Sequence, residues 1–192
     1  MEISKKLFLL DAYALIYRGY YAFIKNPRIN SKGTDTSAVL GFMNSLLEII
    51  RTQNPDYIAV AFDKGGSITR SEMFTEYKSN RDKTPEPIVV AIPYIKEILN
   101  SMNISILEKE GYEADDIIGT VAKDAEKNNF KVYMVTPDKD FAQLVSDNIF
   151  LCKPARMGNS MEIWGVDEVK ERFEVNSPCL LYTSPSPRDD EL

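Results

Sequence analysis

Three short apolar runs, each followed closely by an aspartate, constrain the fold of this chain more than any other feature of its sequence. The runs span residues 7–10, 57–62 and 132–136, and the aspartates are Asp11, Asp63 and Asp138. Short continuous runs of aliphatic and aromatic residues are typical of parallel strands that are buried on both faces. We therefore expect three strands of one parallel sheet, each with an acid at its carboxyl end.

The segments between these runs have the spacing of amphipathic helices. Residues 36–51 place their apolar side chains on one broad face, and the segment that follows Glu113 has apolar residues at positions i, i+3, i+4, i+7, i+8 and i+11. Strands that alternate with helices predict an α/β fold with a parallel sheet. Residues 104–107 and 149–152 are expected to add two further strands.

Acidic residues are expected to gather at one edge of this sheet. In an open parallel sheet the ligand site lies outside the carboxyl ends of the strands, where the three aspartates fall. Four more acids lie close in sequence to strand ends: Glu113, Asp115 and Asp116, at the start of the helix after residues 104–107, and Asp140. The sequence therefore predicts seven carboxylates at one edge.

These carboxylates would repel one another strongly unless cations balanced their charge. The chain contains no histidine, which excludes Ser-His-Asp and Cys-His catalysis and imidazole-based zinc sites. A ligand set made only of oxygen atoms selects Mg²⁺, Mn²⁺ or Ca²⁺, and Mg²⁺ is the usual ion in cells. Several carboxylates around two ions are typical of two-metal phosphoryl transfer.

A purely structural role for the acids is the alternative. A single acid at a helix N-terminus often caps free N–H groups and complements the helix dipole, which would suffice for Asp116 or Asp140 alone. Capping alone does not readily explain acids at four strand ends of one sheet, so the set as a whole favours a metal site.

The net charge of −6 does not argue against a nucleic-acid partner. Residues 1–178 carry 22 basic and 26 acidic side chains, and the remainder has a net charge of +3 once the seven clustered carboxylates are set aside. Basic side chains neutralise phosphates and release counterions, so a mildly basic surface outside the acidic edge is compatible with DNA.

The segment after Asp63 predicts a basic and aromatic helix face, formed by Arg70, Phe74, Tyr77, Lys78 and Arg81. We expect Tyr77 to stack on a base or sugar and Lys78 and Arg81 to contact phosphates. Arg18, which lies close to the end of the first strand, is also expected to contact a phosphate. A solvated helix of balanced charge is the alternative for residues 70–86.

The two cysteines, Cys152 and Cys179, stand far apart, which argues against a disulfide framework and favours a reducing compartment such as the cytoplasm. The N-terminal apolar run is too short for a signal peptide, and no stretch approaches the roughly 20 apolar residues of a membrane helix. We expect a cytoplasmic monomer without a membrane partner.

Four stretches of this sequence closely resemble the N-terminal 5′-nuclease domain of bacterial DNA polymerase I, a relative of the flap endonucleases. They are LFLLDAYALIYRGYYAF, VAFDKGGSITRSEMFTEYKSNRDKTPE, GYEADDIIGT and TPDKDFAQLV, and the resemblance covers residues 5–178 in unbroken order. It implies a PIN-like three-layer α/β fold with a mostly parallel central sheet and a helical arch. It also implies a structure-specific 5′-3′ exonuclease and flap endonuclease that acts on DNA 5′ flaps, nicked duplexes and RNA primers.

The resemblance further implies two Mg²⁺ ions, which Mn²⁺ could replace. The first ion would be held by Asp11, Asp63, Glu113 and Asp115. The second would be served by Asp116, Asp138 and Asp140. Because Asp115 lies between the two sets, we expect it to bridge both ions and to be catalytic.

The segment YKSNR matches the family's arch motif, which grips the single strand and the scissile phosphate. By that match Tyr77 would bind DNA, and Lys78 and Arg81 would be both DNA-binding and catalytic. Arg70 matches the arginine that precedes the motif.

The family continues with a GDxxDN segment and a helix-hairpin-helix, neither of which is present. Residues 179–192 lose all periodicity and are rich in Ser and Pro, so we expect a non-native or disordered tail after a truncated catalytic domain of residues 1–178. A polymerase domain is possible in the intact gene.

A catalytically weak DNA-binding module and a PIN-type ribonuclease are the alternative functions. An aspartyl-phosphate phosphatase is more remote, because such enzymes use a second Asp two residues after the first and Asp11 has none there.

Overall fold

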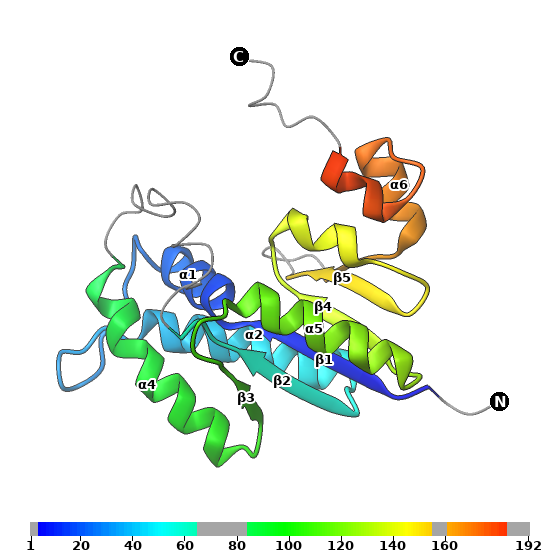
Figure 1. Ribbon diagram of the computed structural model, residues 1–192. Coiled ribbons are helices and arrows are strands. Elements are labelled where there is room, and N and C mark those ends of the chain that lie inside the picture. Colours follow the sequence, from blue (N-terminus) through cyan, green and yellow to red (C-terminus); the bar gives the residue numbers. More distant parts are fainter. Residues whose placement is uncertain (1–3, 65–83, 155–160, 184–192) are drawn as a thin grey trace.

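The computed structural model describes residues 4–64, 84–154 and 161–183 of the 192-residue chain. In these ranges it contains a six-stranded sheet with the order β3-β2-β1-β4-β5-β6 (Figure 1). The strands are β1 Lys6–Asp11, β2 Tyr57–Ala61, β3 Ser105–Leu107, β4 Lys131–Val135, β5 Ile149–Lys153 and β6 Glu162–Trp164. β1 to β5 are parallel and β6 is antiparallel to β5. The prediction of five parallel strands is confirmed, whereas β6 was not predicted.

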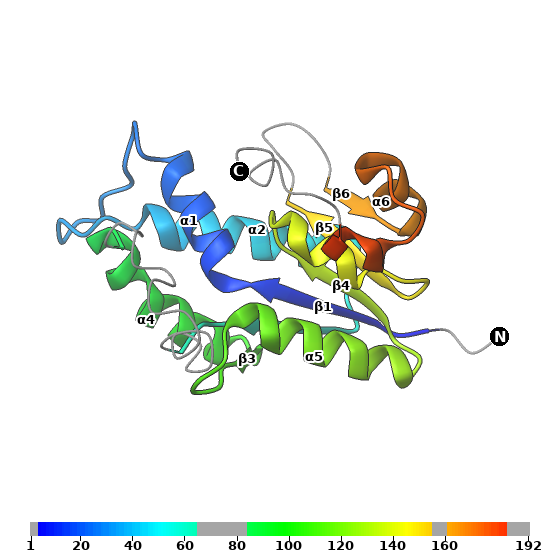
Figure 2. The same ribbon diagram turned by 45° about the horizontal axis from the view of Figure 1, so that its top comes forward.

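The described helices lie on both faces of the sheet. They are α1 Ala12–Ala22, α2 Ser37–Gln53, α4 Glu86–Ser101, α5 Ala114–Lys127 and α6 Val166–Phe173, with short 3-10 helices η1 Lys139–Leu144 and η2 Pro178–Thr183. Figure 2 shows α2 and α5 on opposite sides of the strands. The chain therefore forms three layers, and both helices that the sequence predicted, over residues 36–51 and after Glu113, are confirmed.

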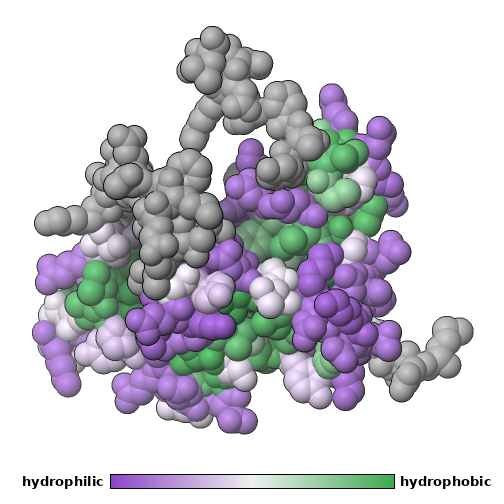
Figure 3. Space-filling model, viewed as in Figure 1, coloured by the Kyte–Doolittle hydropathy of each residue, from purple (hydrophilic) through white to green (hydrophobic). Residues whose placement is uncertain are grey.

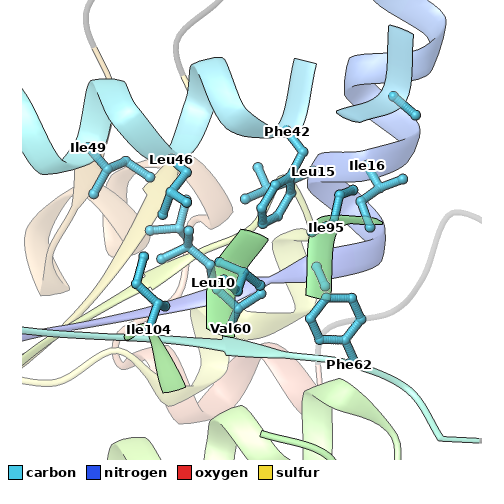
Figure 4. Close-up of a cluster of buried hydrophobic side chains, with 14 of the residues drawn as sticks. Leu10, Leu15, Ile16, Phe42, Leu46, Ile49, Val60, Phe62, Ile95 and Ile104 are labelled. Atoms are coloured by element: carbon cyan, nitrogen blue, oxygen red, sulfur yellow. The ribbon is translucent and has the colours of Figure 1, made fainter. Parts of the chain in front are cut away.

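Alternating side chains of the parallel strands build two separate cores. Phe8 and Leu10 of β1 face a core shared with α1, α2 and α4, whereas Leu9 faces a core shared with α5, η1 and α6. The first core is drawn in Figure 4, where the strand residues Leu10 and Val60 meet side chains of the helices. Because a strand buried on both faces needs an apolar residue at every position, the strands appear in the sequence as unbroken apolar runs.

Helices α1 and α2 approach each other through two glycines. A Cβ atom added at Gly41 of α2 would lie 2.3 Å from the Cα atom of Gly19 in α1. No side chain fits at this crossing, so the two backbones are in direct contact. This contact fixes the position of α1, which begins at the carboxyl end of β1.

The predicted domain boundary at residue 178 falls at the start of η2. Leu181 of η2 packs against the core that contains α5, so η2 continues the packed part of the chain. Residues 184–192 lie outside the described ranges, and the prediction of a non-native tail stays a prediction.

In the view of Figure 3, hydrophilic side chains cover much of the described surface, and apolar side chains gather in patches between them. Within residues 4–64, 84–154 and 161–183, no helix has the length and apolar composition needed to cross a membrane.

Candidate functional site

The sheet topology brings three of the predicted aspartates to one edge. β1 lies between β2 and β4, with Asp11 in register with Ala61 of β2 and Leu10 in register with Val135 of β4. Asp11 ends β1, Asp63 follows β2 and Asp138 follows β4. The three carboxyl ends are therefore neighbours, as the sequence predicted.

Asp11 is held by a hydrogen bond at each of its carboxylate oxygens. Its Oδ1 atom accepts from the backbone N–H of Ala14, 3.1 Å away, which caps α1, and its Oδ2 atom accepts from the hydroxyl of Thr136 at 3.0 Å. Burial raises the pKa of Asp11, these two hydrogen bonds lower it, and the nearby charges of Asp63 and Asp138 raise it further. The net effect is a raised pKa, which a cation bound at this edge would lower by favouring the ionised carboxylate.

Asp63 connects the end of β2 to the start of α5. Its Oδ1 atom accepts from the backbone N–H of Ala114, the first residue of α5, at 2.5 Å. This bond places the Asp63 carboxylate beside the acidic segment Glu113–Asp116, although the two are about fifty residues apart in sequence. The strong hydrogen bond to a helix N-terminus also suits an anionic side chain.

The acids at the start of α5 cap their own helix. Glu113 is buried, with 5% of its surface exposed, and its backbone N–H donates to Oδ2 of Asp116 at 3.1 Å. The backbone N–H of Asp116 in turn donates to Oδ1 of Asp115 at 2.7 Å. The capping role considered for Asp116 from the sequence is therefore present.

Asp138 and Asp140 lie at the start of η1. Asp138 is the N-cap, and its Oδ1 atom accepts from the backbone N–H of Asp140 at 2.9 Å. Both residues are exposed, in contrast to Glu113. They lie at the solvent side of the acidic edge.

The side chain of Tyr13 in α1 also faces this edge. Burial raises its pKa, and the negative charge of Asp63 raises it further. The phenol therefore stays protonated at neutral pH and can act as a hydrogen-bond donor.

The structure thus brings the acidic elements together but leaves the predicted ligand sets untested. Across the described ranges, no group of three or more Asp, Glu or Cys side chains is arranged to hold a metal ion. Backbone N–H groups donate to side-chain oxygens of five of these acids and fix the directions of their carboxylates: Asp11, Asp63, Asp115, Asp116 and Asp138. Cys152 is buried in the core. The atoms available at this edge to coordinate a metal are therefore carboxylate oxygens, which fit a hard divalent cation.

Sequence reasoning missed one residue of this site, Thr136. It is completely buried, and its hydroxyl contacts both Asp11 and the backbone N–H of Asp138. The sequence did contain a sign of this role, because Thr136 stands between a buried strand and the pair Pro137-Asp138.

The basic residues predicted to bind DNA are mostly outside the described residues. Arg70, Tyr77, Lys78 and Arg81 fall in the range 65–83, which the structure does not describe. Arg18 lies on α1 beside a small cleft that includes Glu48 of α2 and Pro154, the residue after β5. It is therefore close to the carboxyl end of a strand, and its contact with phosphate stays a prediction.

Comparison with known proteins places residues 6–174 within the family model described as 5′-3′ exonuclease, N-terminal resolvase-like domain. A 5′-3′ exonuclease of Aquifex aeolicus (strain VF5) is 38% identical over 171 residues, which cover 89% of this chain and 57% of the relative. DNA polymerase I of Bacillus subtilis (strain 168) is 40% identical over 174 residues, 90% of this chain and 19% of the polymerase. The chain thus spans just over half of one relative and about a fifth of the other.

A solved structure of the bacteriophage T5 flap endonuclease, in a pseudo-enzyme–product complex with DNA and metal ions, has the same fold. Its TM-score is 0.67 at 19% sequence identity, with 91% of this chain and 62% of the other covered. The three-layer α/β prediction is confirmed by this similarity.

Proposed function

Because this chain belongs to the family of 5′-3′ exonuclease N-terminal, resolvase-like domains, we propose that it hydrolyses phosphodiester bonds of DNA from 5′ ends with divalent metal ions. The observation that carries the proposal is the meeting of Asp11, Asp63 and Asp138 at the carboxyl edge of the sheet, with Asp63 bonded to the start of α5. An edge of the sheet this rich in carboxylates has more acids than helix capping requires. It has a clear role in binding cations that neutralise and activate a phosphodiester.

Mg²⁺ is the proposed ion, in two sites that Mn²⁺ could also fill. The proposed ligands are those that the sequence indicates: Asp11, Asp63, Glu113 and Asp115 for one ion, and Asp116, Asp138 and Asp140 for the other. When bound, such ions supply an activated water and stabilise the leaving oxygen. The protein's own contribution is to orient the carboxylates, which the backbone N–H groups of Ala14 and Ala114 do for Asp11 and Asp63.

The proposed substrates are 5′ flaps, nicked duplexes and RNA primers. Arg18 would contact a phosphate beside the carboxyl edge, and Arg70, Tyr77, Lys78 and Arg81 would bind the single strand, with Lys78 and Arg81 next to the scissile phosphate. We propose residues 1–178 as the catalytic domain, acting as a monomer.

Asp115→Asn tests the proposal. This variant should cut a labelled 5′ flap at least on the order of 10²-fold more slowly than the wild type in Mg²⁺, because it removes charge at the reacting phosphate. Binding of the flap, followed by fluorescence anisotropy, should persist. Asp124→Asn is the matched control, since Asp124 lies on the same helix but is exposed and forms its ion pair with Lys127, away from the acidic edge.

Three results would contradict the proposal. Cleavage by Asp115→Asn at the wild-type rate would reject the assignment of Asp115. A wild type that binds the flap in Mg²⁺ and Mn²⁺ but never cuts it would be a DNA-binding module. A wild type that prefers unstructured RNA to a DNA flap would be a ribonuclease.

A further inference from the structure

The Thr136 hydroxyl joins two of the acidic strand ends. Thr136 follows β4 and has none of its surface exposed. Its Oγ1 atom lies 3.0 Å from Oδ2 of Asp11 and 3.2 Å from the backbone nitrogen of Asp138. Asp11 and Thr136 are 125 residues apart in sequence, so this contact is purely a product of the fold.

The direction of both hydrogen bonds follows from the chemistry of the groups. A backbone N–H can only donate, so the Thr136 oxygen must accept the bond from Asp138. The hydroxyl hydrogen is then directed at Asp11, whose Oδ2 atom must be the acceptor. A hydroxyl fills both roles at once, whereas the methyl group of valine, which has the same shape, fills neither.

The two bonds hold the carboxylate and the neighbouring backbone in a fixed relation. With Ala14 on Oδ1 and Thr136 on Oδ2, the Asp11 side chain cannot rotate without losing a bond. A carboxylate has about four lone-pair sites, so each Asp11 oxygen keeps one for a cation. The bond to Asp138 N–H also fixes the start of η1, on which Asp138 and Asp140 lie.

We propose that Thr136 is a positioning residue for the divalent ions, which sets the distance and orientation between Asp11 and the Asp138 segment. The proposal rests on the proposed function, because it assigns a partner to ligands of the same site. Partners that orient metal ligands typically contribute about 10- to 100-fold in metal affinity or activity.

The test compares Thr136→Val with Thr136→Ser in the 192-residue chain. Mn²⁺ binding is measured by electron paramagnetic resonance of the free ion, a readout that does not depend on cleavage, and flap cleavage is measured across an Mg²⁺ titration. Thr136→Val should bind Mn²⁺ about 10- to 100-fold more weakly and need correspondingly more Mg²⁺. Thr136→Ser, which restores the hydroxyl, should stay close to the wild type.

Two controls separate positioning from loss of stability. Ile104→Val removes a buried methylene group just before β3, at the end of the sheet opposite the acidic edge. Thr52→Val removes a hydroxyl that donates to the Glu48 carbonyl and accepts from the Gln53 side chain. Neither should change Mn²⁺ binding. If Thr136→Val binds Mn²⁺ as the wild type does, or if Thr136→Ser is as weak as Thr136→Val, the role of Thr136 is refuted. A wild type that binds no Mn²⁺ overturns the proposed function and this inference together.

Discussion

Replacing Gly41 by alanine should destabilise the protein, although alanine is the better helix former. The added Cβ atom would lie 2.3 Å from Cα, 2.9 Å from the carbonyl carbon and 3.0 Å from the oxygen of Gly19. All three atoms belong to the backbone of α1, so no side chain can move aside. The two helices would have to separate by about 1 Å to restore ordinary carbon–carbon contact of roughly 3.5 Å.

The magnitude follows from two opposing effects. Alanine in a helix interior stabilises by about 1 kcal/mol relative to glycine. Overpacking of a well-packed interface costs typically about 1–3 kcal/mol, and separating α1 from α2 also loosens Leu15 against Phe42 in the first core. Because the clash is with backbone, we place the cost at or above the top of that range and expect a net loss of about 2 kcal/mol.

Urea unfolding followed by circular dichroism measures this difference, and a thermal melt should fall by roughly 4–8 °C for a chain of this size. Gly119→Ala is the matched control: its Cβ atom would meet only Cδ1 of Leu144, at 3.3 Å, which is the end of a flexible side chain. That variant should be as stable as the wild type or more so. If Gly41→Ala is as stable as Gly119→Ala, the backbone contact between α1 and α2 is not as close as described.

The remaining predictions concern titration and reactivity. Burial raises the pKa of Asp11, so the folded state favours the protonated carboxyl group. The stability that this preference gives is full below the unfolded-state pKa and is lost as the pH rises through the folded-state pKa. The free energy of unfolding of Asp11→Asn relative to the wild type should therefore increase from about pH 4 to about pH 7, measured by urea unfolding without metal. A constant difference across that range would contradict the raised pKa. Burial likewise raises the pKa of the Cys152 thiol, whereas Cys179 is exposed, so Ellman's reagent should modify one cysteine in the folded protein and both in urea. Rapid modification of both thiols without urea would place Cys152 outside the core.

The strands that could be predicted from the sequence are those buried on both faces. The run 7–10 is apolar throughout because Leu9 and Leu10 enter different cores, and the same holds for Val132 and Val135. β6 could not be predicted, because only Trp164 of its three residues is buried and its pairing with β5 depends on backbone hydrogen bonds. Local pattern carries no information about such a pairing.

The contact between Gly19 and Gly41 lies beyond sequence reasoning for a similar reason. A glycine inside a helical pattern does not reveal whether another element approaches it closely, or which element that is. The partner is set by the angle at which α1 leaves β1, which depends on the packing of both helices on the sheet. The same limit applies to Thr136, whose partner Asp11 comes from a different strand.

Capping and metal binding are compatible roles for one carboxylate, and the charge at this edge favours the proposed metal site. Capping uses one lone pair of Asp11 for Ala14 and the Thr136 hydroxyl uses another, so each carboxylate oxygen keeps one lone pair for a cation. A cap, however, needs only one anion at each helix end. It gives no reason to bury Asp11 where Asp63 and Asp138 both raise its pKa, an arrangement that opposes folding at neutral pH. A divalent cation bound at the proposed site would offset this cost directly, because it would favour the ionised form of all three carboxylates at once.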